Sequence, residues 1–246
     1  MILITGGLGF IGSHTIVELI NKFNSSIIIV DDLSNSKLDV LEKIGKLVDK
    51  SKITYYKLNI LSENFKEIFE KHNIDSVIHF AAFKSVNESI KEPLKYYNNN
   101  VNGTIKLLQL CELNNVKKFI FSSSSTVYGS CKSPFIESSN TGFGITNPYG
   151  QSKYITEKIL MDLSQSSNLK IIILRYFNPV GAHKSGLLGE NPNGIPNNLM
   201  PYILRVAIKN NIDKTLDDVY SSLKIYGNDY NTPDGTCKRD FIHVVD

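Results

Sequence analysis

A tyrosine and a lysine stand four residues apart, at Tyr149 and Lys153. This spacing places both side chains on one face of a helix, and Pro148 just before them suits a helix's first turn. An ammonium group beside a phenol favours the phenolate, which can accept a proton from an alcohol. The Tyr-x-x-x-Lys pattern alone is weak evidence, because chance supplies it often, and a neutral surface pair is its ordinary interpretation.

A run of serines offers a partner for that phenol. Residues 122–125 are all serine and follow the apolar residues 119–121, so they stand where a strand would end. Parallel α/β sheets place their active sites at the carboxyl ends of strands. Ser124 could therefore hydrogen-bond both the phenolate and a reacting oxygen, although a polar strand end would explain the serines taken alone.

The first twelve residues predict a phosphate-binding loop. Gly6, Gly9 and Gly12 satisfy the pattern GxxGxxG, and Gly7, Gly9 and Gly12 satisfy GxGxxG. The glycines follow a strand-like run and open a helical pattern, where backbone N–H groups and the helix N-terminus can hold a pyrophosphate. Glycine leaves room for that approach. A tight turn without a ligand is the alternative.

An acidic pair follows about 20 residues after the glycines, as expected for a residue that binds a ribose. Asp31 and Asp32 end the second strand-like run. A carboxylate accepts hydrogen bonds from the ribose hydroxyls and repels a 2′-phosphate, so NAD is favoured over NADP, and no arginine follows nearby. Asn35 and Ser36 could add polar contacts. A solvated strand-end acid is the alternative.

The apolar pattern predicts the scaffold that brings these residues together. Six short apolar or β-branched runs alternate with helical patterns, such as residues 14–23 and 101–113. The runs are residues 2–4, 27–30, 53–56, 77–80, 119–121 and 171–174. Continuous apolar strands alternating with helices indicate an α/β fold with a parallel sheet covered on both faces. Right-handed crossovers then make the sheet doubly wound and Rossmann-like.

The alternation stops after about Tyr176, which predicts a smaller second domain. Residues 181–200 are rich in glycine, proline and asparagine and indicate a loop. A helix is expected over residues 199–210, and strands are expected over residues 223–226 and 241–245. We therefore expect an NAD-binding domain at residues 1–177 and a partial substrate domain at residues 178–246.

Composition narrows the classes of protein. The 246 residues include 27 basic and 24 acidic residues without a basic block, which argues against nucleic acid as a partner. The three cysteines are widely spaced and the five histidines share no ligand spacing, so we expect no metal site and reduced thiols in a cytoplasmic protein. No apolar run is long enough to cross a bilayer, and the start lacks the basic leader of a signal peptide.

Together the motifs resemble the extended short-chain dehydrogenase/reductase family, and within it the branch that epimerises UDP-sugars at C4. The resemblance spans residues 1–246. Its most specific segments are residues 77–84 (VIHFAAFK), 96–103 (YYNNNVNG), 175–183 (RYFNPVGAH), 194–201 (GIPNNLMP) and 239–243 (RDFIH).

The resemblance implies a reaction and a role for each central residue. Tyr149 would remove the proton from the 4-hydroxyl of UDP-galactose or UDP-glucose while bound NAD takes hydride from C4. The 4-keto sugar would then turn over and receive the hydride on its other face. Lys153 would hold the nicotinamide ribose and tune Tyr149, and Ser124 would bridge the phenol and the substrate oxygen.

The resemblance also implies two sets of contacts. The cofactor contacts, beside Ser124, Tyr149 and Lys153, are Gly6, Gly9, Phe10, Ile11, Gly12, Asp31, Asp32, Leu33, Ser34, Asn35, Ser36, Asn59, Ile60, Phe80, Ala81, Ala82, Phe83, Lys84, Asn99 and Phe177. The UDP-sugar contacts, beside Ser124 and Tyr149, are Asn178, Asn198, Leu199, Lys224, Ile225, Tyr226 and Arg239. The forked guanidinium of Arg239 suits a diphosphate.

The sequence departs from the family's pattern in several places. Asn59 stands where an aspartate is expected near the adenine, Asp32 replaces an asparagine, and the stretch 211–222 is longer than expected. The family also continues beyond the run at residues 239–243, with further nucleotide-binding residues. We therefore expect a fragment, or a shortened form that binds UDP-sugars poorly.

Two other functions compete with epimerisation. A nucleotide-sugar dehydratase or decarboxylase needs a carboxyl group beside the serine, where this chain has Ser125 and Thr126, so epimerisation is favoured. A non-catalytic NAD-binding protein often lacks the tyrosine or the lysine, and both are present here. By family analogy, helices at residues 98–102 and 149–162 could pair in a homodimer.

Overall fold

The computed structural model describes residues 1–225 and 227–246. The chain forms two compact units, Met1–Tyr176 and Phe177–Asp246. The first unit contains the large parallel sheet and the predicted phosphate-binding loop, and the second contains a short strand pair and a long helix.

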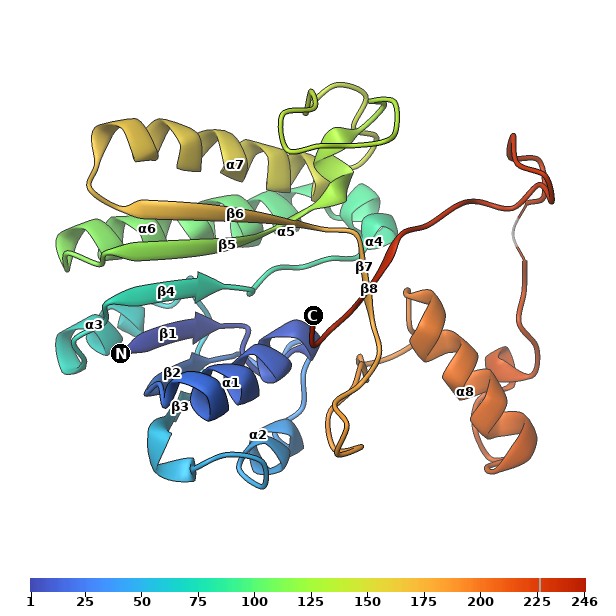
Figure 1. The fold of residues 1–246 in the computed structure, drawn as a ribbon, viewed down its shortest axis with the longest axis horizontal. Coiled ribbons are helices and arrows are strands. Elements are labelled where there is room, and N and C mark those ends of the chain that lie inside the picture. The colour runs from blue at the N-terminus through green and yellow to red at the C-terminus, as the bar shows by residue number, and fades with distance from the viewer. Residues whose placement is uncertain (226) are drawn as a thin grey trace. The chain divides into compact units, whose positions relative to one another are not determined.

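A six-stranded parallel sheet forms the centre of the first unit (Figure 1). Its order is β3-β2-β1-β4-β5-β6, so the chain adds strands outward from β1 in both directions. The strands are β1 (Ile2–Thr5), β2 (Ile27–Val30), β3 (Ile53–Tyr56), β4 (Ser76–His79), β5 (Lys118–Ser124) and β6 (Lys170–Tyr176). Ile2 aligns with Ile27 of β2 on one side and with Ser76 of β4 on the other. The predicted doubly wound sheet is confirmed.

Helical segments connect these strands. The segments of the first unit are α1 (Phe10–Phe23), α2 (Asp39–Ile44), η1 (Lys50–Lys52), η2 (Glu63–Phe65), α3 (Lys66–Lys71), α4 (Val86–Lys91), α5 (Pro93–Tyr96), η3 (Tyr97–Asn102), α6 (Gly103–Leu113), η4 (Ser125–Tyr128) and α7 (Pro148–Ser166). η3 is a π-helical turn that leads directly into α6. The predicted helix at residues 101–113 is therefore the end of η3 followed by α6.

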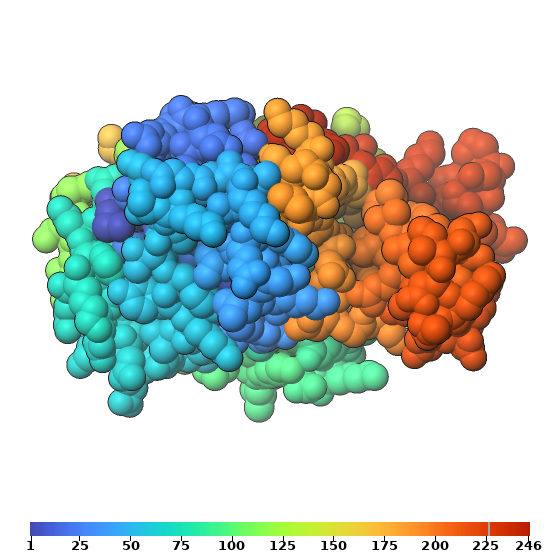
Figure 2. All heavy atoms as spheres, turned by 90° about the horizontal axis from the view of Figure 1, so that it is seen from below, coloured from blue at the N-terminus to red at the C-terminus, as the bar shows by residue number. Residues whose placement is uncertain are grey.

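The larger core of the first unit lies between the sheet and the helices α3, α6 and α7. Leu107 of α6 and Leu160 of α7 are buried against Phe119 and Phe121 of β5, in the same cluster as Ile68 of α3. Figure 1 shows α6 and α7 beside β5 and β6. Seen from below, the first unit presents the blue to cyan atoms of its N-terminal segments (Figure 2).

The edge strand β6 departs from the prediction of a sheet covered on both faces. Ile171 and Ile173 pack against the core, so alternation turns Ile172 and Leu174 to the opposite face. There Ile172 is 53% exposed and Leu174 is 38% exposed. The apolar run predicted a strand correctly but did not predict that only one face of this edge strand is covered.

The second unit contains a parallel pair of short strands, β7 (Asn178–Val180) and β8 (Phe241–His243), and the helix α8 (Leu199–Asn211). The last apolar run forms a strand that pairs with β7 over Phe241–His243 only, because Val244 and Val245, predicted to continue it, lie in a turn. The strand predicted over residues 223–226 is wrong for Leu223, Lys224 and Ile225, which have no regular structure, and Tyr226 lies outside the described residues. A short run with alternating side chains needs a neighbouring strand before it can form a ladder.

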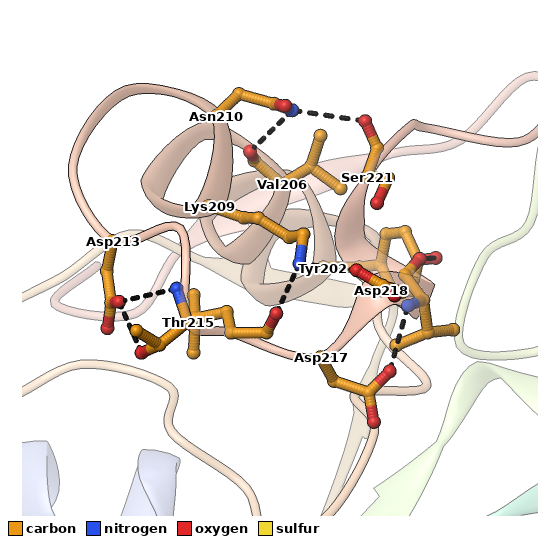
Figure 3. A network of polar contacts seen from close by, with 11 residues as sticks. Tyr202, Val206, Lys209, Asn210, Asp213, Thr215, Asp217, Asp218 and Ser221 are labelled. Carbon is orange, nitrogen blue, oxygen red and sulfur yellow. Dashed lines mark hydrogen bonds and ion pairs between the residues drawn. The ribbon is translucent and has the colours of Figure 1, made fainter.

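A polar network ties the last turns of α8 to the segment that follows (Figure 3). Lys209 donates to the Leu216 carbonyl and pairs with Asp218 at 2.9 Å. Asn210 donates to the carbonyls of Val206 and Ser221. The long stretch at residues 211–222 is therefore an ordered turn of the second unit that includes the segment η5 (Asp218–Tyr220).

Among residues 1–225 and 227–246, no helix has both the length and the apolar character that crossing a bilayer requires.

Candidate active site

The predicted phosphate-binding loop joins β1 to α1, at the carboxyl edge of the sheet. Gly6 has a φ of +67°, and a Cβ built there would lie 2.7 Å from the Ala81 backbone nitrogen. A Cβ on Gly12 would lie 2.6 Å from the Gly6 carbonyl oxygen, so any side chain would separate the helix from the loop. Gly9 begins α1 without a side-chain cap, so the first N–H groups remain directed outward to an anion.

Asp31 holds this loop in place. Its carboxylate is buried and accepts hydrogen bonds from the backbone N–H of Leu8 at 3.0 Å and of Leu33 at 3.0 Å. The Ser36 hydroxyl donates to the same carboxylate at 2.6 Å. The sequence predicted Asp31 as a ribose acid and did not predict that it also joins the end of β2 to the glycine loop.

The two departures from the family pattern lie in contact with each other. Asn59 Nδ2 donates to Asp32 Oδ2 at 2.6 Å, and Asn59 Oδ1 accepts from the Leu61 N–H at 2.8 Å. The Ser34 N–H donates to the other oxygen of Asp32 at 2.9 Å. Both residues therefore stand beside the strand end where the nucleotide side of the site was predicted.

The loop after β4, residues 80–84, is hydrogen-bonded to the π-helical turn η3. Asn100 accepts from the Phe83 N–H at 2.9 Å and donates to the Phe83 carbonyl at 3.0 Å. The predicted cofactor contact Asn99 is buried beside it and donates to Asn100 at 3.0 Å. Asn100 also donates to Ser152 of α7 at 3.1 Å, so one side chain connects the β4 loop to α7.

The helix α7 presents the tyrosine and the lysine as predicted. It begins at Pro148, and the Asn147 side chain caps it by accepting from the Gly150 N–H at 2.8 Å. Lys153 is buried, donates to the Ser122 carbonyl at 2.7 Å and stands over the Phe121 ring at 4.8 Å. Tyr149 is half-buried one turn earlier on the same helix.

Ser124 meets that tyrosine at the end of β5. The Ser124 hydroxyl lies near enough to the Tyr149 phenol to lower the pKa of that phenol. The Ser124 oxygen also accepts from the Thr126 hydroxyl at 3.0 Å and from the Thr126 N–H at 3.2 Å. Because Thr126 supplies two donors to the Ser124 oxygen, the Ser124 proton is available to the phenolic oxygen. The structure thus brings together the predicted trio of Ser124, Tyr149 and Lys153.

Burial acts on both titratable groups of the trio. It raises the pKa of the Tyr149 phenol, against which the Ser124 hydrogen bond acts. Burial lowers the pKa of the Lys153 ammonium to about 7, and the charge of Glu157 opposes this shift. The protein by itself thus moves both groups toward their neutral forms. The sequence-based expectation of a phenolate favoured by the lysine omitted the cost of removing both charges from water.

Sequence reasoning missed a third member of the same helix face. Glu157 follows Lys153 by four residues, is fully buried, and accepts from the Ser123 hydroxyl at 2.5 Å. Arg175 of β6 donates to it from Nε at 3.0 Å and from Nη2 at 2.8 Å. The repeated spacing Tyr149, Lys153, Glu157 was the signal that could have found it.

The predicted UDP-sugar contacts, with Phe177, belong to the second unit. Asn178 donates to the Asp240 carbonyl at 2.7 Å, which connects it to the turn that carries Arg239. Asn198 begins α8 and donates to Glu190 at 2.5 Å, and Leu199 follows it, exposed. Lys224 and Ile225 are exposed, and Arg239 donates to the neighbouring Lys238 carbonyl.

Within residues 1–225 and 227–246, no group of three or more His, Cys, Asp or Glu side chains could hold a metal ion. The buried His79 is held instead by hydroxyl groups, those of Thr5 at 2.6 Å and Thr104 at 2.9 Å.

Comparison with known proteins agrees with this site. The model of the NAD dependent epimerase/dehydratase family matches residues 2–246. UDP-glucose 4-epimerase of Dictyostelium discoideum is 51% identical over the whole chain, which covers 68% of that protein, and the Yersinia enterocolitica enzyme of the same name is 50% identical, with 70% covered. The crystal structure of UDP-glucose 4-epimerase from Bifidobacterium longum in complex with NAD+ and UDP is 48% identical, with a TM-score of 0.90, and the match covers 99% of this chain and 70% of that one.

A doubly wound dinucleotide fold and a Ser-Tyr-Lys trio thus define the class of protein. The chain belongs to the NAD dependent epimerase/dehydratase family.

Proposed function

We propose that the chain is an NAD-dependent epimerase that interconverts UDP-galactose and UDP-glucose, a reaction of galactose metabolism. The observation that carries the proposal is the meeting of Ser124, Tyr149 and Lys153 at the end of β5. The similar proteins from Dictyostelium and Yersinia are UDP-glucose 4-epimerases, and the similar structure from Bifidobacterium holds NAD+ and UDP. The reaction would pass through a 4-keto sugar and involve no net redox change.

The first unit fits NAD. The loop between β1 and α1, which we call the glycine cradle, has no room for side chains at Gly6 and Gly12. The uncapped N-terminus of α1 suits the pyrophosphate. Asp31 has an oxygen with capacity for a ribose hydroxyl beyond its three donors, and together with Asp32 it would repel a 2′-phosphate. Bound NAD would supply a hydride acceptor and donor next to C4 of the sugar.

The residues of the trio would handle the proton. Tyr149 would accept the proton of the sugar's 4-hydroxyl, aided by Ser124, which can donate to the phenolic oxygen. A positive Lys153 ammonium would stabilise the phenolate that this step requires. On the return step the phenol would give the proton back to the 4-keto oxygen, so that C4 regains a hydroxyl of either configuration.

The segment η4 favours epimerisation over elimination of water. Its side chains are those of Ser125, Thr126, Val127 and Tyr128, none of which is a carboxylic acid. Thr126 instead donates to Ser124. A dehydratase would need a carboxyl group here to protonate a leaving hydroxyl.

The UDP part of the substrate is assigned to the second unit. We include in the proposal Asn178, Asn198, Leu199, Lys224, Ile225, Tyr226 and Arg239 as its contacts. Arg239 is exposed and offers further donors to a diphosphate besides the one that it gives to Lys238.

The test begins with the protein as purified. Bound nucleotide is released by denaturation and identified, and turnover of UDP-galactose is measured for the parent and for Tyr149→Phe. We expect NAD, conversion to UDP-glucose, and a loss of at least ~100-fold in kcat for Tyr149→Phe, because general base catalysis contributes about that much. Tyr154→Phe, on the same helix, is the matched control. A 4-keto-6-deoxy product, or unchanged turnover in Tyr149→Phe, would refute the proposal.

The proposal includes a homodimer and a cytoplasmic location. The dimer would use the helices at residues 98–102 and 149–162, where Ile155 and Met161 of α7 are exposed. The location is supported by the three cysteines, which are free of disulfides. Light scattering tests the dimer: Ile155→Lys should yield monomers, and an unchanged mass would contradict this interface.

A further inference from the structure

Three successive residues of β5 contact three residues of α7 that are spaced by four. The Ser122 carbonyl accepts from Lys153 at 2.7 Å, and the Ser123 hydroxyl donates to Glu157 at 2.5 Å. The next residue, Ser124, acts on the remaining member, Tyr149, by lowering the pKa of its phenol. The serine run and the spacing on the helix therefore form one set of contacts between a strand end and a helix face. Of its members, Glu157 and Ser123 have no part in the proposed reaction.

Within this set, Glu157 connects α7 to the neighbouring strands. Its side chain is 1% exposed, and a buried carboxylate is tolerated only when it is paired and hydrogen-bonded. It meets that condition through Ser123 on β5 and through Arg175 on β6, which donates from two nitrogens. Arg175 is itself held over the Tyr128 ring at 5.0 Å and by the Glu137 carbonyl at 3.1 Å. The carboxylate thus joins α7 to two strands at once.

We propose that Glu157 is a positioning residue: it fixes the register of α7 against β5 and β6, and its negative charge supports the positive charge of Lys153 one turn away. The part that concerns catalysis rests on the proposed function, since it needs Lys153 and Tyr149 to act in the reaction. The structural and electrostatic part needs only the contacts described above.

The groups around Lys153 support the electrostatic part. The ammonium contacts the Ser122 carbonyl and the Phe121 ring of β5, and it interacts electrostatically with Glu157 of α7 and with His79 of β4. Burial lowers the pKa of His79 to about 3, so this imidazole is uncharged at neutral pH. Glu157 is the group whose charge raises the pKa of Lys153.

Arg175 limits how far the charge of Glu157 raises the pKa of Lys153. It faces Glu157 from β6 and neutralises part of its charge. Removing the carboxylate alone would also leave Arg175 without its ion-pair partner. Both consequences lower the pKa of Lys153, because each makes the surroundings of the ammonium more positive.

The direct test is a pH titration of Lys153 in the full chain, followed by the NMR shift of its ε-carbon and assigned by its loss in Lys153→Met. In Glu157→Gln we expect the midpoint to fall by about one pH unit, because a carboxylate near the ammonium is lost. Glu18→Gln removes the carboxylate of an exposed pair with Lys22 on α1 and is the matched control, with no expected shift. An unchanged midpoint in a folded Glu157→Gln protein would overturn the proposal.

Two further variants test the proposal in case the Glu157→Gln protein does not fold. Glu157→Gln/Arg175→Gln removes both charges together and leaves no unpaired ion, and it should still lower the midpoint. Ser123→Ala keeps both charges and removes one contact, so the midpoint should stay and only the register of α7 should loosen, seen as faster amide exchange over residues 148–157. Equal exchange in Ser123→Ala and in the parent would contradict the register role.

Turnover separates this proposal from the proposed function. With an active parent, Glu157→Gln should lower kcat at least ~10-fold with little change in KM, and the alkaline limb of its pH profile should move to lower pH. A uniform loss at every pH would indicate a structural role alone and would contradict the charge role. An inactive parent would refute the proposed function, while the Lys153 titration would still decide the role of Glu157.

Discussion

Asn59 and Asp32 are best understood as a pair. Asn59 donates to Asp32 at 2.6 Å, so an aspartate at position 59 would place two carboxylates in contact. We predict that Asn59→Asp lowers the free energy of unfolding at pH 8 by about 1 kcal/mol, because the half-buried Asp32 carboxylate loses its donor and meets a second negative charge. Urea unfolding measures the loss.

The reversed pair is the control for this prediction. Asp32→Asn/Asn59→Asp restores one donor and one acceptor and should regain most of the lost stability. A double variant that is as unstable as Asn59→Asp would show that the two side chains do not act together.

At the scale of residues, spacing predicted most of the trio and little of its surroundings. Tyr149 and Lys153 are one turn apart on a helix, so their meeting follows from the sequence alone. The contact from Asp31 to the Leu8 N–H and the ion pair of Glu157 with Arg175 join residues that are distant in sequence. No local pattern specifies such contacts, because they depend on how strands and helices pack.

At the scale of elements, the cap of α7 determines where the tyrosine lies. Asn147 accepts from the Gly150 N–H at 2.8 Å, and Tyr149 is in the first turn. We predict that Asn147→Ala lowers the free energy of unfolding by about 1 kcal/mol and also reduces kcat, since the first turn loses its cap. Asn147→Asp keeps an acceptor and is the control. Thermal unfolding and turnover measure both effects, and an Asn147→Ala protein equal to the parent would contradict the prediction.

The strands were predictable where an uninterrupted run of apolar, β-branched or aromatic residues marks them. β2 and β3 match their apolar runs residue for residue, whereas β5 continues through three serines that carry no strand signal. Those serines stay extended because β6 pairs with them, as with Ser124 and Tyr176. The helix expected at residues 98–102 forms as the π-helical turn η3. The sequence did not predict its π-helical form, which is supported by contacts such as that of Asn100 with Ser152.

At the scale of the whole molecule, His79 couples the stability of the first unit to pH. Burial lowers its pKa to about 3, while an unfolded histidine titrates near 6.5. The unfolded chain therefore binds more protons between these values. The stabilisation is complete above pH ~6.5 and is lost as the pH falls toward 3, by about 1.4 kcal/mol per pH unit.

Urea unfolding at pH 7, 6 and 5 tests this dependence. The parent and the control His243→Gln, which changes an exposed histidine, should lose stability in parallel, and His79→Gln should lose less. Equal pH dependence in His79→Gln and the parent would show that another group is responsible.

The central claim is that the glycine cradle and the Ser-Tyr-Lys trio serve one reaction at one sugar carbon. The most direct measurement uses UDP-galactose that carries deuterium at C4, in ordinary water. We predict that the UDP-glucose formed keeps its deuterium at C4, because the hydrogen leaves and returns within the same site. Product in which that deuterium is replaced by solvent hydrogen would contradict the account.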